Sequence, residues 1–177
     1  MKFRENCTYA LATVSSMGVR ITPVDRQPVH TSHTFEMQAT SAETNVLNVA
    51  SSLGLKTKVL TRFVKDSAIA SFIKSELRRR GIDYEGVEVA QGDPWGYRHQ
   101  FNIADSGFGM RAPRVWNDRA GEVGRTLSAD EFDLERIFGQ DGVGILHISG
   151  LIAAMSEETT KFCLAVAKAA KEQLEKI

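Results

Sequence analysis

Histidine and cysteine side chains are the strongest metal ligands and nucleophiles in the chain, and their spacing argues against both kinds of site. His30 and His33 lie three residues apart in a segment of alternating polarity. On a β-strand, residues three apart point to opposite faces, so this pair does not predict a metal site. Cys7 and Cys163 are far apart and fit neither a zinc pattern nor a disulfide framework. They are expected to be reduced thiols in a cytoplasmic protein.

Glycine-rich loops bind phosphate when they lead directly into a helix, whose first backbone amides face the anion. The nearest candidate here is Gly107-Phe108-Gly109, and no helical pattern follows it. No other part of the chain combines clustered glycines with the start of a helix. The sequence therefore predicts no phosphate-binding loop of this type.

Composition excludes several classes of partner. The chain has 177 residues, with 22 Lys plus Arg balanced by 22 Asp plus Glu. A balanced charge gives no reason to expect nucleic-acid or membrane-surface binding. No apolar run approaches the roughly 20 residues that span a bilayer. Apolar residues at 42% and charged residues at 25% are ordinary for a globular domain with a full core.

The elements that position the polar residues alternate between strand and helix. Short apolar runs predict buried strands at 9–14, 59–64 and 143–148, the last as a central strand. Helical periodicity follows residues 40, 66 and 156. Strands alternating with helices are typical of an α/β fold, in which a parallel Rossmann-type sheet carries helices on both faces.

The starts and apolar faces of the helices can also be predicted. Thr40 and Glu43 fit a capping box, with Thr40 as the N-cap, and Asp66 and Ser156 suit the caps of the next helices. The predicted buried faces are Val46, Val49, Ala50 and Leu53 in the first helix, Ile69, Phe72, Ile73 and Leu77 in the second, and Phe162, Cys163, Val166, Ala169 and Ala170 in the last.

Two segments do not fit this alternation of strands and helices. Residues 29–37 and 97–103 alternate between apolar and polar side chains, which predicts half-exposed strands, and 114–117 fits a returning strand. We expect them to form a small antiparallel lid from two insertions, at about 18–39 and 95–118. A thin flap cannot bury its apolar face against itself, so this face should cover a ligand or a second copy of the flap.

Several segments, in the same order and with similar spacing, resemble motifs of the ribokinase (PfkB) family, most closely those of 2-keto-3-deoxygluconate kinases. They are TSAETNVLNVASSLGL at 40–55, Asp83 and Val87 of a GVD-like stretch, WGYR at 95–98, RAPRVWNDR at 111–119 and LHISGL at 146–151. Each match is short, but together they extend over nearly the whole chain.

The resemblance implies a ribokinase-like domain in which the sugar lies between the parallel sheet and a β lid, and in which two lids often pair in a dimer. Residues 1–177 are then expected to be the N-terminal portion of a single domain. The family's second half, which carries the GAGD motif with the catalytic aspartate and most of the pocket for ATP and Mg²⁺, has no counterpart here. The chain alone is therefore expected to be inactive.

The resemblance also implies sugar contacts at the start of the first helix. Asn45 matches a family asparagine that faces the sugar, although an exposed helical residue would fit the same position. Thr40 and Ser41 replace two family glycines whose bare backbone approaches the substrate. Their hydroxyls should narrow that approach or bind the sugar themselves, and as N-cap residues they also have a structural role.

Three further candidates lie in the lid motifs. Arg119 matches the arginine of the family's YDR motif, which implies a contact with the substrate carboxylate. Pairing with Asp118 or Glu122 is the alternative. Asn117 replaces the aromatic residue of that motif. Arg98 stands at the tyrosine of the family's TGLY, where it would add a second cation for an acidic sugar or face solvent.

The sequence thus predicts the sugar-binding and lid half of an ATP-dependent carbohydrate kinase. Its substrate would be a sugar acid such as 2-keto-3-deoxygluconate, phosphorylated on a primary hydroxyl in the complete enzyme. A catalytically inactive sugar-binding module and one half of a split kinase are the alternatives. A homodimer through the lid is expected, with no nucleic acid or membrane as a partner.

Overall fold

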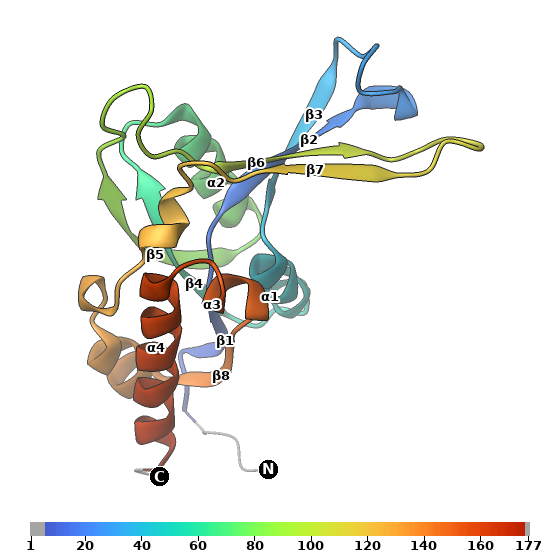
Figure 1. The fold of residues 1–177 in the computed structure, drawn as a ribbon. Helices are drawn as coiled ribbons and strands as arrows, with labels where there is room; N and C mark the ends of the chain where they lie inside the picture. The colour runs from blue at the N-terminus through green and yellow to red at the C-terminus, as the bar shows by residue number, and fades with distance from the viewer. Residues whose placement is uncertain (1–5, 176–177) are drawn as a thin grey trace.

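The computed structural model describes residues 6–175, and its centre is a four-stranded parallel sheet (Figure 1). The strand order is β5-β4-β1-β8. The strands are β1 (Tyr9–Val14), β4 (Thr57–Val64), β5 (Ile82–Val89) and β8 (Val143–His147). All three pairings are parallel, so the carboxyl ends of the strands share one edge of the sheet.

Helices cover both faces of this sheet, as the sequence predicted. α1 (Ala42–Ser52) and α2 (Ala68–Arg79) pack over one core, which includes Leu47, Ile73 and Leu77. α4 (Glu157–Glu175) packs over the other through Phe162, Cys163 and Val166. The short helices are η1 (Val24–Arg26), η2 (Val123–Thr126), η3 (Ala129–Glu131), the π-helical η4 (Arg136–Gly142) and α3 (Gly150–Ala153).

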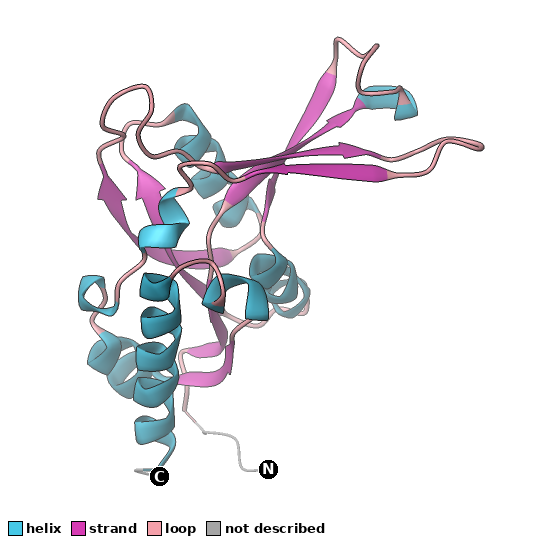
Figure 2. Ribbon diagram, viewed as in Figure 1, coloured by secondary structure: helices cyan, strands magenta, loops and turns pink. Residues whose placement is uncertain are grey.

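A second sheet projects away from the α/β layer (Figures 1 and 2). It comprises β2 (Gly18–Pro23), β3 (Phe35–Thr40), β6 (Gln100–Asp105) and β7 (Arg114–Asp118), in the order β3-β2-β6-β7. The expectation of a purely antiparallel sheet needs correction, because the central pair β2 and β6 is parallel. Each of these strands begins a hairpin that starts at the α/β layer, so the two run in the same direction.

Part of the first alternating segment is not a strand. β3 begins only at Phe35, and the chain before it turns at Pro28. The carbonyl oxygen of Pro28 accepts hydrogen bonds from the backbone N–H groups of Thr31 and Ser32, at 3.1 Å each. The alternating pattern across residues 29–34 was therefore misleading, since local turn bonds satisfy this backbone instead of a neighbouring strand.

The N-caps of α1 and α2 each lie one residue after the predicted position. Ser41, not Thr40, caps α1, because β3 continues through Thr40, which pairs with Gly18. The Ser41 hydroxyl accepts the N–H of Thr44 at 3.0 Å. Ser67, not Asp66, caps α2. The N-terminal turn of α4 does begin at Ser156, whose hydroxyl accepts the N–H of Thr159 at 3.1 Å.

Most of the predicted buried face of α1 is exposed, although Ala50 is partly buried. Val46, Val49 and Leu53 are 40%, 62% and 74% exposed, and we call these three residues the apolar stripe. The face that packs on the sheet instead presents Glu43, Thr44 and Leu47. The position of β8 also differs from the prediction. It was predicted to be a central strand, but it is an edge strand of its sheet. Its Ile145, on the outer part of the sheet, is also exposed.

No described helix is long and apolar enough to cross a membrane.

A buried histidine joins the two sheets where they meet. The Nδ1 atom of His99, just before β6, lies 2.9 Å from the carbonyl oxygen of Met17, just before β2. Its Nε2 atom lies 3.3 Å from the backbone nitrogen of Val64, at the end of β4. The neutral ring satisfies both contacts, with Nδ1–H as donor and Nε2 as acceptor. Burial lowers the pKa of His99, although the Met17 hydrogen bond partly opposes this.

We therefore expect acid to weaken the fold through His99. Because its pKa is lower in the folded chain than the ordinary value of about 6.5, the unfolded chain takes up the proton first. The stabilising contribution should be complete above pH 6.5 and lost as the pH falls below it, at up to about 1.4 kcal/mol per pH unit. Urea unfolding between pH 7.5 and 5.5 measures this slope. His99→Gln should flatten it, whereas His30→Gln, at an exposed position, should not.

Candidate functional site

A narrow cleft lies at the carboxyl edge of the parallel sheet, where it meets the second sheet. Ser15 and Ser16 follow β1, Ser149 follows β8, and Ser41 begins α1. The residues lining the cleft are Ser16, Ser41, Ala42, Glu43, Gln100, Arg119, Leu151, Ile152 and Met155. Open α/β sheets bind ligands at the carboxyl ends of their strands, so this is the candidate functional site.

Glu43 is a buried carboxylate that ties three elements together. It is 2% exposed and accepts a hydrogen bond from the Ser15 hydroxyl at 2.7 Å. The Ser149 hydroxyl, at the N-cap of α3, donates to its other oxygen. The predicted capping role for Glu43 is therefore wrong: its side chain points into the site rather than back to the N-cap amide. It fixes α1, the end of β1 and the start of α3 relative to one another.

A second buried carboxylate, Glu122, lies just before η2. It accepts a hydrogen bond from the Ser16 hydroxyl, and Nη1 of Arg119 lies 3.0 Å from each of its oxygens. The Glu122 side chain is fully buried, and that of Arg119 is 30% exposed. Adjacent serines thus bind different carboxylates. The positive charge of Arg119 is already compensated within the chain.

Two glycines allow the close approach that this arrangement requires. A Cβ atom on Gly124 would lie 2.2 Å from Cβ of Ser16, and one on Gly18 would lie 2.0 Å from Cγ of Gln100. Contacts below 3.0 Å are essentially never found for real Cβ atoms. Gly124 therefore lets η2 reach Ser16, and Gly18 leaves room for the Gln100 side chain at the cleft.

The structure brings some of the predicted site residues together and separates others. Ser41 and Arg119 both line the cleft. Thr40 is buried at the end of β3, directly before Ser41. Asn45 is exposed on α1 and is not among the lining residues, and Asn117 is exposed on β7.

Arg98 is held by its own neighbours. It pairs with Asp118, and its Nε atom donates to the carbonyl oxygen of Ala120 at 2.7 Å. The Asp118 carboxylate has a lowered pKa, mainly because it accepts the hydrogen bond from Arg98. Arg98 and Arg119 are therefore both neutralised by carboxylates. For Arg119, pairing with a nearby carboxylate was the alternative given by the sequence.

Sequence reasoning missed Glu122 and Gln100 as site residues. Glu122 lies in an irregular segment between β7 and η2, where no periodicity indicates which side chains are buried. Gln100 belongs to the polar phase of the alternating strand that includes Arg98 and Asn102. That phase was the available signal, because alternate residues of a strand share one face.

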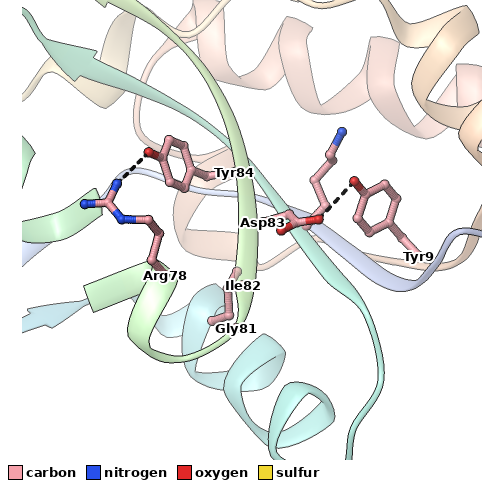
Figure 3. A pocket seen from close by; sticks show the side chains of 7 residues that line it. Tyr9, Arg78, Gly81, Ile82, Asp83 and Tyr84 are labelled. Carbon is pink, nitrogen blue, oxygen red and sulfur yellow. Dashed lines mark hydrogen bonds between the residues drawn. The ribbon is translucent and has the colours of Figure 1, made fainter. Parts of the chain in front are cut away.

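A larger hollow lies at the opposite edge of the sheet, around the starts of β1, β4 and β5 (Figure 3). The Tyr9 hydroxyl donates to Asp83 at 3.2 Å, and Arg78 donates to the Tyr84 hydroxyl at 3.0 Å. Burial is the main cause of the raised pKa of Tyr9. Lys58 pairs with Glu85 at 3.0 Å. The polar groups in this hollow already have partners, and none of the predicted site residues lies here.

The fold and the site together define a ribokinase-like α/β domain with a projecting β sheet. No family model matches the chain. A 2-dehydro-3-deoxygalactonokinase from Haloferax volcanii is 27% identical over 159 residues, which is 86% of this chain and 46% of the relative. This similarity confirms the resemblance to PfkB-type sugar kinases predicted from the motifs.

Solved structures of carbohydrate kinases share the fold. A 2-dehydro-3-deoxygluconokinase from Thermotoga maritima gives a TM-score of 0.82 at 22% identity, covering 93% of this chain and 48% of that one. A PfkB family carbohydrate kinase from Listeria grayi gives 0.80 at 24% identity, covering 92% and 48%. The chain thus spans about half the length of the relatives it matches.

Proposed function

We propose that this chain is the sugar-binding and lid half of an ATP-dependent carbohydrate kinase for a sugar acid such as 2-keto-3-deoxygluconate. The observation that carries the proposal is the cleft between the two sheets. Its wall combines the N-terminus of α1 at Ser41, the buried Glu43 carboxylate and the Arg119 guanidinium. Hydroxyl, carboxylate and guanidinium groups match the donors and acceptors of a polyhydroxylated acid.

We propose no site for ATP or Mg²⁺ among the described residues. A group of three or more His, Cys, Asp or Glu side chains able to hold a metal ion is absent from residues 6–175. A structure described as ribokinase II from E. coli, with a TM-score of 0.74 and 16% identity, was solved in complex with ATP and Mg²⁺. We assign the binding of ATP, and the transfer of its phosphoryl group to a primary hydroxyl, to the complete enzyme. No step of that transfer is assigned to this chain.

We further propose that the second sheet is a lid that pairs with the lid of a second copy. One of its faces presents exposed apolar side chains, among them Phe35 and Met37 on β3 and Trp116 on β7. Burying such a face stabilises association through the hydrophobic effect. Sedimentation equilibrium should show a dimer that Met37→Glu weakens. A monomer at high concentration would contradict the lid interface.

A specific surface favours the split-kinase alternative as a second candidate. The apolar stripe on α1 is exposed, and the outer edge of β8 pairs with no other described strand. A polypeptide that added a strand to β8 and a helix over the stripe would cover both. The coding sequence downstream of codon 177, or a neighbouring gene, should then encode a GAGD segment. Its absence would favour an inactive sugar-binding module.

The proposed function is tested by binding and by turnover. Calorimetry should show that the purified chain binds 2-keto-3-deoxygluconate, and assays should show no sugar-dependent ATP hydrolysis. Ala42→Leu, which fills the cleft from an exposed position, should abolish binding. Asn48→Leu, exposed on the same helix outside the cleft, should leave it unchanged. Absence of binding would refute the proposal, and turnover by this chain would show that its catalytic centre lies within it.

We also propose a cytoplasmic location, in keeping with the reduced thiols expected from the sequence. Cys163 lies on the face of α4 that is buried in the core. This burial, and to a smaller extent the negative charge of Glu43, raises the pKa of its thiol to about 11. Such a thiol stays protonated and unreactive at neutral pH. Cell fractionation checks the location.

A further inference from the structure

The two central strands of the second sheet, β2 and β6, begin beside each other where that sheet joins the α/β layer (Figure 1). Their first residues, Gly18 and Gln100, are paired. Met17 and His99 directly precede them, so the contact between Nδ1 of His99 and the Met17 carbonyl joins the bases of both strands. The contact of Nε2 with Val64 joins these bases to β4. One side chain therefore links the second sheet to the parallel sheet.

The end of β4 needs this contact because β4 is longer than its neighbour. β1 pairs with β4 only as far as Leu60, and its chain then leaves the parallel sheet. The Lys65 N–H is bonded to β5 at 2.7 Å, so the preceding N–H, of Val64, faces the edge that β1 has left. A buried backbone N–H requires an acceptor, and the His99 ring supplies it.

Protonation of His99 would break one of these two contacts and keep the other. In the neutral ring, Nε2 accepts the Val64 N–H with its lone pair. In the cation both ring nitrogens carry a hydrogen, so two donors would face each other across 3.3 Å. The contact with Met17 survives, because Nδ1 donates in both forms. Acid therefore separates the second sheet from β4 while β2 and β6 stay joined.

The charged groups around His99 give no support to its cation. Lys74 of α2 acts on the ring, and its positive charge opposes protonation. Lys74 itself lies 4.6 Å from the centroid of the Phe63 ring and pairs with Glu88 of β5. A buried cation without an anion is costly, so the protonated ring should move towards water. The other charged side chains of the adjoining segments have partners or are exposed: Arg62 pairs with Glu131, Arg98 with Asp118 and Glu122 with Arg119, and Lys65 and Asp66 are exposed.

A movement of His99 would reach the cleft through its neighbours in the chain. Gln100 follows it and lines the cleft. Arg98 precedes it, and its backbone is bonded to the segment that leads into η2. The Arg98 N–H donates to the carbonyl oxygen of Gly121, and its carbonyl oxygen accepts the N–H of Val123, both at 2.9 Å. Displacement of the ring should therefore shift two walls of the cleft together.

We propose that His99 is a positioning residue that holds the second sheet in place beside the cleft in its neutral form and releases it in acid, so that ligand binding depends on pH. This inference rests on the proposed function. The ring is 2% exposed and contacts backbone atoms, so it acts through the position of its neighbours. Binding should be complete above the ordinary histidine pKa of about 6.5, and should weaken as the pH falls through the pKa of His99, which burial lowers.

Calorimetry with 2-keto-3-deoxygluconate at pH 7.5 and 5.0 tests this assignment. The carboxylate of the ligand stays ionised throughout this range. The affinity of the wild type should fall by at least about three-fold and, because the pKa of His99 lies below about 6.5, by no more than about thirty-fold. His99→Gln, which cannot take up a proton, should bind equally well at both pH values. His30→Gln, exposed in the loop between β2 and β3, is the matched control and should keep the full pH dependence.

Hydrogen exchange without ligand supplies an independent readout. Between pH 7.5 and 5.0 the protection factor of the Val64 amide should fall, because its acceptor is lost. The amides of residues 57–60, which lie between β1 and β5 in the sheet, should keep their protection. Equal losses at both places would show a general weakening of the fold and would overturn the proposal. The same pH dependence of affinity in His99→Gln and wild type would also overturn it.

The two measurements separate this inference from the proposed function. Unchanged affinity of the wild type in acid would refute the role of His99 and leave the proposed function standing. Failure of the wild type to bind the sugar acid at pH 7.5 would refute the proposed function, and the pH dependence of binding with it.

Discussion

Replacing Gly124 with alanine should lower the free energy of unfolding by about 3 kcal/mol, as the sum of overpacking and a lost hydrogen bond. The new Cβ would lie 2.2 Å from Cβ and 2.9 Å from Cα of Ser16. The second contact involves backbone, which a side-chain rotation cannot relieve. Either η2 or the segment after β1 must move, and that movement separates the Ser16 hydroxyl from the buried Glu122 carboxylate.

Urea unfolding measures this loss, and Gly150→Ala is the matched control. Gly150 begins α3, and a Cβ atom there would meet no other atom within 4 Å. Alanine is also the better helix former, so the control should stay within about 0.5 kcal/mol of the wild type. Equal stabilities of the two variants would show that η2 does not require the close contact with Ser16.

Arg119→Ala is expected to lower the free energy of unfolding by about 2–3 kcal/mol, somewhat less than for a fully buried ion pair. The Glu122 side chain is fully buried, so removal of the guanidinium leaves a carboxylate with only the Ser16 hydroxyl as its described side-chain partner. The partial exposure of Arg119 lets water enter and reduces the loss. Circular dichroism during urea titration measures it.

A second arginine gives the control for this prediction. Arg79 also pairs with a glutamate three residues away, Glu76, but its side chain is 69% exposed. Surface pairs contribute little, so Arg79→Ala should cost much less than Arg119→Ala. Adding Glu122→Gln to Arg119→Ala should restore part of the loss, because it removes the unpaired charge. If the double variant is less stable than Arg119→Ala, desolvation of Glu122 is not the cause.

The periodicity of apolar residues predicted the strands and helices of the α/β layer well, but it did not show which helix faces pack against the sheet. The face of α4 was found correctly because Phe162, Cys163 and Val166 repeat at helical spacing and pack on the sheet. The same reasoning gave the wrong side of α1. Val46, Val49 and Leu53 are just as periodic, but a pattern shows only that a face is apolar and not that anything in the chain covers it.

The site was harder to predict because its key side chains have two possible partners. Glu43 fits a capping box by spacing, yet in the fold it meets Ser15 and Ser149, which are 28 and 106 residues away. Arg119 fits a ligand contact by motif, and in the fold its Nη1 atom also lies 3.0 Å from a carboxylate oxygen of Glu122. Local spacing could not decide between these partners, because the competing contacts form only when distant strands bring their ends together.

Within residues 6–175, the outer edge of β8 pairs with no strand, and this affects how these residues behave in concentrated solution. An unpaired strand offers its backbone N–H and C=O groups to any other strand, and charged residues or proline normally discourage such contacts. The five residues from Val143 to His147 include no lysine, arginine, acidic residue or proline. Because Ile145 is also exposed on this strand, this edge is where aggregation should begin, so solubility should depend on what covers β8.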